Sequence, residues 1–547
     1  MTAPAALRPL GETLDQRQKA LLIGSLLVSL FVGAIDQTVV STAMPRIVSE
    51  LGGFGLLSWV FTSYMLSSTV VVPLVGRLSD TFGRKWFIIG GIVVFQAGSI
   101  ACGAAPNIVM LILARGLQGV GGGAIMASVF ATVGDIFPPA ERGKYIGIFT
   151  GTFSLASILG PTVGGLITDN LGWRWVFYIN IPFGLIAMPA VWMNLPARRA
   201  PAKIKIDWLG AFLLSAASVL FLLALVWADR RYDWGSREII GLISVSLVLL
   251  GAFVYQETRH SSPMVPLHLF KNRVFLMSNL TGMAIGIGMF GSITYLPTFV
   301  QTALGASATA SGVVTTPNAL GMLVASVIGG QIIARTGRYK WQTVVGAVIF
   351  LVAMGFLTTL DVGMPRWHVS AFMIILGAGT GLVMPTQSLV VQNAVPYEYL
   401  GVASSSSQFF RQIGGVFGTA VFGTILATSY HGAFDKQVPA AVQDAIPPPI
   451  LQHFDDPTLQ LDRRTFTVVQ KQVLALPDGE RLLAETTTGQ KEAVAVAVTH
   501  IFKVAVIIAG LCLILTLFIP ELPLRREITG DEAAPPRGAP AGTPSDG

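Results

Sequence analysis

The chain has 547 residues, of which 52% are hydrophobic and 12% are charged, and its mean hydropathy is +0.66. A soluble protein of this length needs more polar surface, so the composition excludes that class and indicates a membrane protein. The formal net charge of +7 does not indicate nucleic-acid binding, because the basic residues are spread over short loops.

About 20 apolar residues are needed to cross the hydrocarbon core of a bilayer. By this criterion we predict an all-α polytopic membrane protein with fourteen membrane-spanning helices. The predicted helices begin near Ala20, Leu57, Trp86, Ile108, Ile146, Val176, Trp208, Ile239, Val274, Thr309, Thr343, Val369, Gly401 and Ile501.

The distribution of Lys and Arg predicts how these helices are oriented. When the N-terminus is placed in the cytoplasm, most basic residues outside the spans fall on the cytoplasmic side. The short outer connections then keep only Arg46, Arg174, Arg230, Arg231, Arg237 and Arg366. We therefore expect both termini in the cytoplasm and a multi-pass protein of the inner (plasma) membrane.

A hydrophilic hairpin, GRLSDTFGRK at residues 76–85, joins the second and third predicted spans. A weaker copy, GQIIARTGR, begins 254 residues later at Gly330. Two further pairs of segments match at an offset of 258, namely 119–123 with 377–381 and 136–143 with 394–401. Spans 1–6 therefore correspond to spans 9–14 in parallel orientation, which is typical of transporters built from two related halves.

The repeat predicts a division of the chain into five parts. These are a cytoplasmic N-terminus (1–19), a six-helix bundle (20–195), two inserted spans with basic linkers (196–272), a second six-helix bundle (273–520) and a disordered cytoplasmic tail (521–547).

Residues 430–497, within the second bundle, form one long hydrophilic stretch on the outer side. Its Pro447–Pro449 run and the later Pro477-Asp478-Gly479 predict short amphipathic helices with turns rather than an enzyme domain. We expect this stretch to cover the outer mouth or to dock a periplasmic adaptor, and an inert loop is the alternative.

Asp36 is the only carboxylate predicted deep inside a span, and Arg115 lies deep in the fourth span. Each is about eight or nine residues from the outer end of its helix, so both lie at similar depth. Buried charges are costly and usually face a watery cavity or each other. A carboxyl group in such a place can bind a proton from one side and release it to the other. A fixed structural ion pair is the alternative.

Arg411, in the thirteenth span, is a third intramembrane charge, and its own span contains no acidic residue near it. If Asp36 is neutral, Arg115 and Arg411 make the cavity positive, which favours anionic, zwitterionic or neutral amphiphiles over dications. The alternative is that Arg411 binds backbone carbonyls and only stabilises the fold. The other candidate cavity residues, each of which can instead bond a neighbouring helix, are Gln37, Thr38, Gln118, Gln387 and Gln408.

Five segments together resemble one known family. They are AIDQTVV at 34–40, the hairpin at 76–85, RGLQG at 115–119, GPTVGG at 160–165 and WRWVFYINIP at 173–182. In this order they resemble the fourteen-span drug:proton antiporter group of the major facilitator superfamily, and the resemblance covers residues 20–520.

The resemblance implies a fold of two six-helix bundles with two inserted helices. It also implies a proton-coupled antiporter that exports amphipathic or hydrophobic small molecules by alternating access, as in multidrug efflux and antibiotic resistance. Asp36 and Arg115 would couple protons, and the proton gradient would supply energy without a cofactor. Export of an endogenous lipid, siderophore or metabolite by the same mechanism is the alternative.

The resemblance further implies that the hairpin at 76–85 is a conformational latch. We expect Gly76 and Gly83 to allow tight turns, and Arg84 and Lys85 to anchor at the cytoplasmic surface. Asp80 is expected to pair with them or with the positive N-terminal end of the thirteenth span.

In the fifth span, Gly160, Pro161, Gly164 and Gly165 predict a kinked helix with a smooth face that permits close packing. The resemblance implies that this segment marks antiporters, and helix packing alone is the alternative.

Two other functional classes lack their sequence signals. A primary pump needs a nucleotide site, and the chain has no GxxxxGK[ST] motif. The six histidines lie in loops or near span ends without metal-ligand spacing, so we predict no metal site and no enzyme activity. The expected partners are a small amphipathic substrate, protons and the lipid bilayer, and not nucleic acid.

Overall fold

The computed structural model of the chain describes residues 14–52, 56–197, 206–228, 231–461 and 463–524. Its regular structure in these ranges is helical, and fourteen helices are long and apolar enough to cross a membrane, as predicted. Most of the predicted N-terminal segment and nearly all of the predicted tail lie outside the described residues.

The first half of the chain forms seven helices. They are α2 (Gln16–Leu51), α3 (Leu57–Phe82), α4 (Arg84–Gly103), α5 (Ile108–Ile136), α6 (Pro139–Asn170), α7 (Trp175–Tyr178) and α8 (Asn180–Asn194). The inserted pair is α9 (Trp208–Trp227) and α10 (Arg237–Arg259).

The second half begins with the short η2 (Leu267–Lys271). Its long helices and the segments joined to them are α11 (Arg273–Thr298), η3 (Phe299–Ala303), α12 (Ala308–Thr315), α13 (Pro317–Thr336), α14 (Lys340–Leu357), α15 (Arg366–Asn393), η4 (Tyr397–Tyr399), α16 (Leu400–Gln437) and α20 (Gly479–Leu517).

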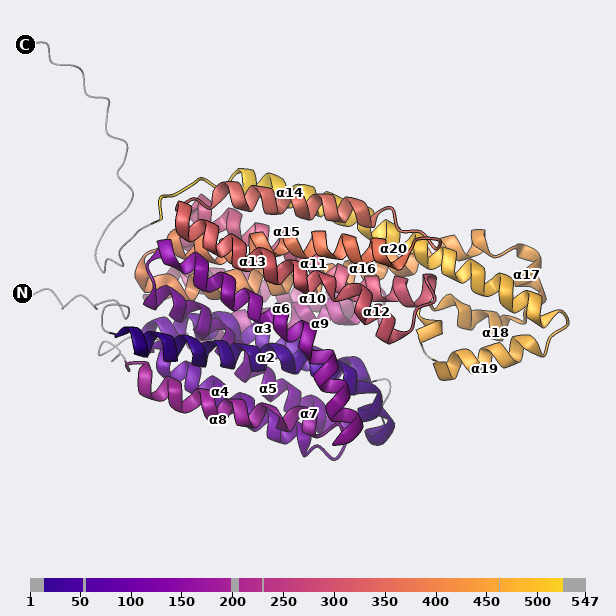
Figure 1. Cartoon of the computed structure of the whole chain (residues 1–547), viewed down its shortest axis with the longest axis horizontal. Coiled ribbons are helices and arrows are strands. Elements are labelled where there is room, and N and C mark those ends of the chain that lie inside the picture. The colour runs from indigo at the N-terminus through magenta and orange to yellow at the C-terminus, as the bar shows by residue number, and fades with distance from the viewer. Residues whose placement is uncertain (1–13, 53–55, 198–205, 229–230, 462, 525–547) are drawn as a thin grey trace, which may run out of the picture.

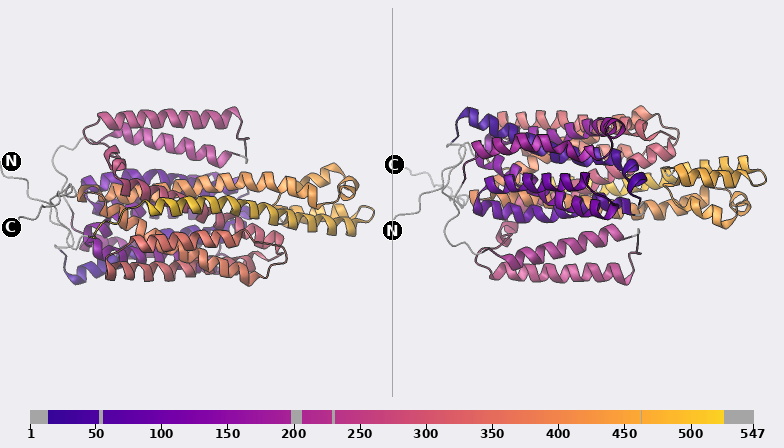
Figure 2. Two further views of the ribbon diagram at one scale, coloured as in Figure 1. Left: turned by 90° about the horizontal axis from the view of Figure 1, so that it is seen from above. Right: turned by 90° about the horizontal axis from the view of Figure 1, so that it is seen from below.

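The long helices run side by side along the longest axis of the molecule (Figure 1). The described chain begins at Leu14 and ends at Leu524, and both residues pack into one apolar cluster with Tyr339. We call this end of the bundle the terminal end and the opposite end the far end. The α9–α10 hairpin lies along one side of the bundle (Figure 2), where α9 packs against both α3 and α16.

The glycine-rich segments of α5 and α15 are used in the same way in both halves. On α5, an added Cβ at Gly121 would lie 2.6 Å from the Cα of Phe95 on α4, and one at Gly119 would meet Tyr64 on α3. On α15, one at Gly379 would lie 2.9 Å from the Cα of Phe350 on α14. The matching close approaches show why small residues occupy these positions in both copies of the repeat.

The two halves are joined from the middle of the bundle to the terminal end. The Thr69 hydroxyl of α3 donates to Gln412 of α16 at 2.6 Å, and the Gln392 amide of α15 donates to the Phe130 carbonyl of α5 at 3.1 Å. On the other side of the bundle, Gly147 of α6 packs directly on the backbone of Ser326 on α13. Two helix seams, α3 with α16 and α6 with α13, therefore hold the terminal end together.

At the far end, α16 and α20 continue beyond the other helices and carry a small helical cap (Figure 2). The far-end cap is residues 438–478. Its short helices are α17 (Ala440–Ala445), α18 (Pro448–Leu451), η5 (Gln452–Asp455), η6 (Leu459–Leu461) and α19 (Arg463–Leu474). The Tyr430 hydroxyl of α16 donates to the Phe454 carbonyl at 2.7 Å, so the cap packs on the extended helices.

The predicted hydrophilic connection, 430–497, is thus longer than the segment that joins α16 to α20 in the structure, which is residues 438–478. Residues 430–437 continue α16, and α20 begins at Gly479, well before the start predicted near Ile501. These helix extensions contain polar residues, so a search for apolar runs does not include them. They stay helical because their apolar faces pack in the core of the far-end cap, for example through Phe434 and Leu482.

Candidate functional site

A polar network surrounds Asp36 in the middle of the first half. Its carboxylate accepts hydrogen bonds from Arg115 Nη1 at 2.5 Å, from Gln118 Nε2 at 2.9 Å and from Asn180 Nδ2 at 2.8 Å. Both Asp36 and Arg115 are 1% exposed. The predicted pair on spans 1 and 4 therefore meets directly, and Gln118, predicted to line the cavity, belongs to the same network.

Helix geometry places the amide donors. Gln118 follows Arg115 by one turn of α5, so both side chains lie on the same face. Asn180 is the first residue of α8, directly after a break at Ile179. Pro182 lacks a backbone N–H, so it cannot complete a continuous helix through this point. The Ser99 hydroxyl of α4 accepts from both Gln118 and Asn180 and links the two amides.

The guanidinium of Arg115 is held on its other sides as well. It lies 4.3 Å from the centre of the Tyr64 ring, and its Nε donates to the Val60 carbonyl at 3.3 Å. Next to Asp36 and Asn180 lies a cavity of about 160 Å³ whose other lining residues are Phe31, Ile35, Val39, Val163, Val176, Ile179 and Phe183. The carboxylate thus has polar partners on one side and an apolar cavity on the other.

The donors around Asp36 compensate its buried charge. The charge of a buried carboxylate is costly unless positively charged and neutral hydrogen-bond donors compensate it. Arg115 supplies the opposite charge, and the amides of Gln118 and Asn180 supply neutral hydrogen bonds. Because the donors come from α5 and α8 while Asp36 is on α2, the network joins three helices.

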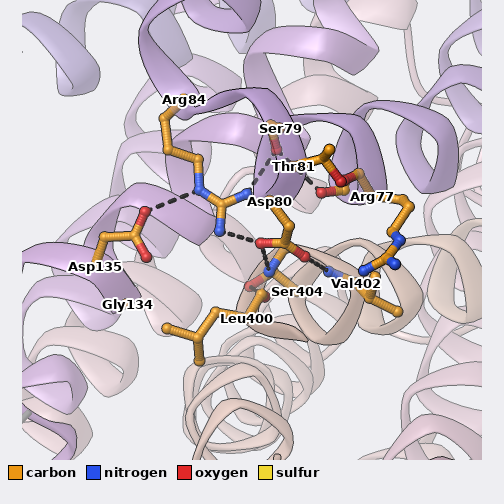
Figure 3. A network of polar contacts seen from close by, with 12 residues as sticks. Arg77, Ser79, Asp80, Thr81, Arg84, Gly134, Asp135, Leu400, Val402 and Ser404 are labelled. Atoms are coloured by element: carbon orange, nitrogen blue, oxygen red, sulfur yellow. Dashed lines mark hydrogen bonds and ion pairs between the residues drawn. The ribbon is translucent and has the colours of Figure 1, made fainter. Parts of the chain in front are cut away.

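The hairpin residues form a second network at the terminal end (Figure 3). The Asp80 carboxylate accepts from the backbone N–H groups of Gly401 at 2.8 Å and Val402 at 2.9 Å, in the first turn of α16. Arg84 bonds Asp80 and also donates to Asp135 of α5 at 2.9 Å. A carboxylate at the positive N-terminal end of a helix is favourable, and here it joins the two halves.

Two expectations about the hairpin need correction. Arg84 is 5% exposed and lies between two carboxylates, so it is not a surface anchor. Gly76 is inside α3 and does not make a turn; an added Cβ there would lie 2.8 Å from the Gly401 carbonyl. Only Gly83, with φ of 92°, occupies the left-handed region that favours glycine. Lys85 donates to the Trp192 carbonyl of α8 at 2.6 Å.

The second copy of the hairpin reproduces the close approach but not the ion pair. Gly330 of α13 packs on the Gly143 backbone of α6, just as Gly76 packs on α16. Ala334 stands where the first copy has Asp80, so this seam has no carboxylate at that position. The charged network therefore lies only in the seam between α3 and α16 among the described residues.

The glycines of α6 pack against α2, close to the Asp36 network. An added Cβ at Gly164 would lie 2.8 Å from the Val39 carbonyl, and one at Gly160 would overlap the Thr38 hydroxyl. An added Cβ at Gly165 has open space around it. Pro161 lies within α6, which continues to Asn170. The smooth face predicted for this segment thus includes Gly160 and Gly164 but not Gly165.

This difference gives a matched prediction. Gly164→Ala is expected to lower the free energy of unfolding by about 1–3 kcal/mol, because the methyl group meets the Val39 backbone and cannot be avoided by a rotamer change. Gly165→Ala is expected to be neutral or stabilising, since alanine is the better helix former. Thermal unfolding of the purified variants in detergent measures both, and equal destabilisation would contradict the packing described.

The remaining predicted cavity residues are dispersed. Gln37 is exposed and is hydrogen-bonded to Tyr64, and the Thr38 hydroxyl donates to the carbonyls of Ile35 and Ala156. Gln387 is buried in the second half, where its amide donates to the Ser278 carbonyl at 2.5 Å. Gln408 and Arg411 bond each other on α16. The structure does not bring these second-half residues into the Asp36 network.

Sequence reasoning missed three residues of these networks. Asn180 lies within the WRWVFYINIP segment, which was a usable signal, but its contact with Asp36 depends on the helix break. Ser99 looked like any small polar residue in an apolar span. Asp135, which is 3% exposed, is one residue from the end of α5, and its position at the end of a span gave no signal of its contact with Arg84.

Comparisons with known proteins agree with this architecture. The multidrug transporter protein MdtP of Bacillus subtilis (strain 168) is 42% identical over 425 residues, which cover 78% of this chain and 78% of that protein. Multidrug resistance protein 3 of the same organism is 35% identical over 413 residues, which cover 76% of this chain and 80% of that protein.

The fold is also found among solved structures. The proton:xylose symporter XylE aligns with a TM-score of 0.58 at 13% identity, over 93% of this chain and 97% of that chain. At this identity the likeness shows a common fold only. Residues 26–419 match the Major Facilitator Superfamily, which confirms the resemblance seen in the sequence. The chain is therefore a membrane transporter that belongs to the major facilitator superfamily.

Proposed function

We propose that this protein is a proton-coupled antiporter of the inner (plasma) membrane that exports amphipathic or hydrophobic small molecules. The observation that carries the proposal is the Asp36 network. A fully buried carboxylate, paired with Arg115 and held by amides from two further positions, is suited to bind and release one proton per cycle.

The terminal end is taken as the cytoplasmic end, in agreement with the Lys and Arg bias of the sequence. In the described conformation the two seams and the Asp80 latch close this end. Proton binding at Asp36 from the outside then weakens its bond to Arg115 and favours reopening toward the cytoplasm. Loss of the proton to the cytoplasm resets the cycle, so proton entry drives export.

The names of the relatives support the substrate class. Both Bacillus proteins are named for multidrug transport or multidrug resistance, and the chain covers more than three quarters of each of them. We therefore favour amphipathic drugs over an endogenous lipid, siderophore or metabolite, and we expect the protein to contribute to antibiotic resistance. A periplasmic adaptor that contacts the far-end cap remains part of this proposal.

The test is proton movement driven by substrate. Inverted membrane vesicles containing the protein are given an inside-acid pH gradient, and a panel of anionic, neutral and cationic amphiphiles is added. Antiport predicts that some members of the panel release protons, seen as recovery of a quenched pH dye, while vesicles without the protein do not respond. If no member of the panel moves protons in the presence of the protein, the antiport proposal is wrong.

A further inference from the structure

Arg411 is a buried cation without a carboxylate partner in the described part of the chain. It is 6% exposed, and no carboxylate oxygen of the described residues lies within ion-pair distance of it. Its guanidinium donates to Gln408 Oε1, a neutral acceptor. By contrast, the buried guanidinium groups of Arg84 and Arg115 each meet at least one carboxylate.

A buried hydrogen-bond donor without an acceptor, the Gln408 amide, lies beside this guanidinium. Gln408 is 1% exposed, and its Nε2 has no hydrogen-bond partner in the described chain. Arg411 carries five N–H donors, and the neighbouring amide adds two more. Buried donors without acceptors are costly, and an uncompensated charge is the most costly case. Arg411 and Gln408 therefore form a cluster of hydrogen-bond donors without an anionic acceptor among the described residues.

The position of the pair on α16 indicates which way it faces. Gly286 and Met283 of α11 pack on the backbone of α16 near Arg411 and Gly414, while Gln412 accepts from Thr69 of α3. Successive helical residues are about 100° apart, which places Gln408 between these two contact faces. The guanidinium bonds Gln408, so it points to the side of α16 that lies between the two halves of the transporter.

We propose that Arg411 and Gln408 form a binding site for the anionic headgroup of the exported amphiphile, a sulfonate, carboxylate or phosphate. This rests on the proposed export function and specifies its cargo. The guanidinium donates to two oxygens of the headgroup, and the Gln408 amide donates to a third oxygen of a sulfonate or phosphate or to one of the two oxygens of a carboxylate. The apolar part of the molecule extends along the neighbouring helices. The bound headgroup supplies the anion that the described residues do not provide.

The test compares two matched dansyl probes, one ending in a sulfonate and the other in a trimethylammonium group. Their equilibrium binding to the purified protein is measured by fluorescence anisotropy in phosphatidylcholine nanodiscs, without any pH gradient. Arg411→Gln is expected to weaken sulfonate binding about tenfold or more, while binding of the cationic probe changes little. Arg411→Lys keeps the positive charge but not the paired contact of the guanidinium, so it is expected to bind the sulfonate more weakly than wild type and more tightly than Arg411→Gln.

Two further variants separate the site from general effects of charge or folding. Lys436→Gln removes a positive charge from the exposed far end of the same helix and is expected to leave both affinities unchanged. Gln408→Leu keeps the arginine and is expected to weaken only the sulfonate probe, by a few fold. Unchanged sulfonate affinity in Arg411→Gln, in protein that elutes and unfolds like wild type, would overturn the proposal.

The same assay identifies the source of the headgroup. If phosphatidylglycerol in the nanodisc displaces the sulfonate probe, the natural anion is a lipid phosphate, and if it does not, a free amphiphile is the cargo. The assay needs no proton transport. Arg411-dependent binding without antiport in vesicles would therefore leave this site standing while the proposed coupling fails, and antiport without such binding would do the reverse.

Discussion

Replacing Asp36 by Asn is expected to reduce substrate-driven proton release in inverted vesicles to the level of vesicles that lack the protein. The amide has nearly the shape of the carboxyl group but cannot bind and release a proton at this site. It also leaves Arg115 buried without its counter-ion, which is expected to cost about 3 kcal/mol of stability. The measurement is recovery of the quenched pH dye, together with the amount of folded protein in the vesicles.

Two controls define what this result means. Asp36→Glu keeps a titratable carboxyl group and is expected to retain part of the coupled transport. Glu50→Gln removes a carboxylate from the same helix, where Glu50 pairs with surface residues Arg46 and Arg174, and is expected to transport normally. Normal substrate-driven proton release in Asp36→Asn would place the proton site elsewhere and contradict the mechanism.

Replacing Asp80 by Ala is expected to open the terminal end of the molecule. The substitution removes the only side chain described as accepting from the Gly401 and Val402 N–H groups, and it removes one of the two carboxylates at Arg84. Loss of a buried charged partner costs about 3–5 kcal/mol, which is enough to shift a two-state equilibrium more than a hundredfold. Distances between spin labels at Lys144 on α6 and Arg335 on α13 are expected to lengthen.

The matched control for this variant is Glu141→Gln. Glu141 is an exposed carboxylate in the first turn of α6, at the same end of the molecule, and no described ion pair includes it. It is expected to leave the label distances unchanged. If Asp80→Ala keeps the wild-type distance distribution, the charged latch does not hold this end closed, and the glycine seams alone are sufficient.

Much of the fold could be predicted because membrane spans depend on local composition. Fourteen apolar runs and a repeat at nearly constant offset were enough to predict the helices and the two halves. The ends of α16 and α20 could not be predicted in this way, because they are polar and are held as helices by the far-end cap. Hydropathy identifies helix segments that contact lipid. It does not identify polar helix segments that pack against each other outside the membrane.

The contacts of the candidate site also differ in how far the sequence could predict them. The contact between Asp36 and Arg115 followed from their equal depth, since a buried charge needs a partner of opposite sign. The contact of Asn180 with Asp36 could not be predicted, because it depends on the break between α7 and α8. Arg84 was misplaced for a related reason. Its second partner, Asp135, comes from the end of another span, and proximity of that kind exists only after folding.

The long extensions of α16 and α20 also have a practical consequence. Because α16 and α20 run without interruption from the bundle to the far-end cap, the cap is rigidly attached to the second half. An antibody fragment raised against the cap, or a small protein inserted between α18 and α19, would rotate with that half. Such a handle would supply an orientation marker for image alignment of a transporter that otherwise lies almost wholly within its micelle.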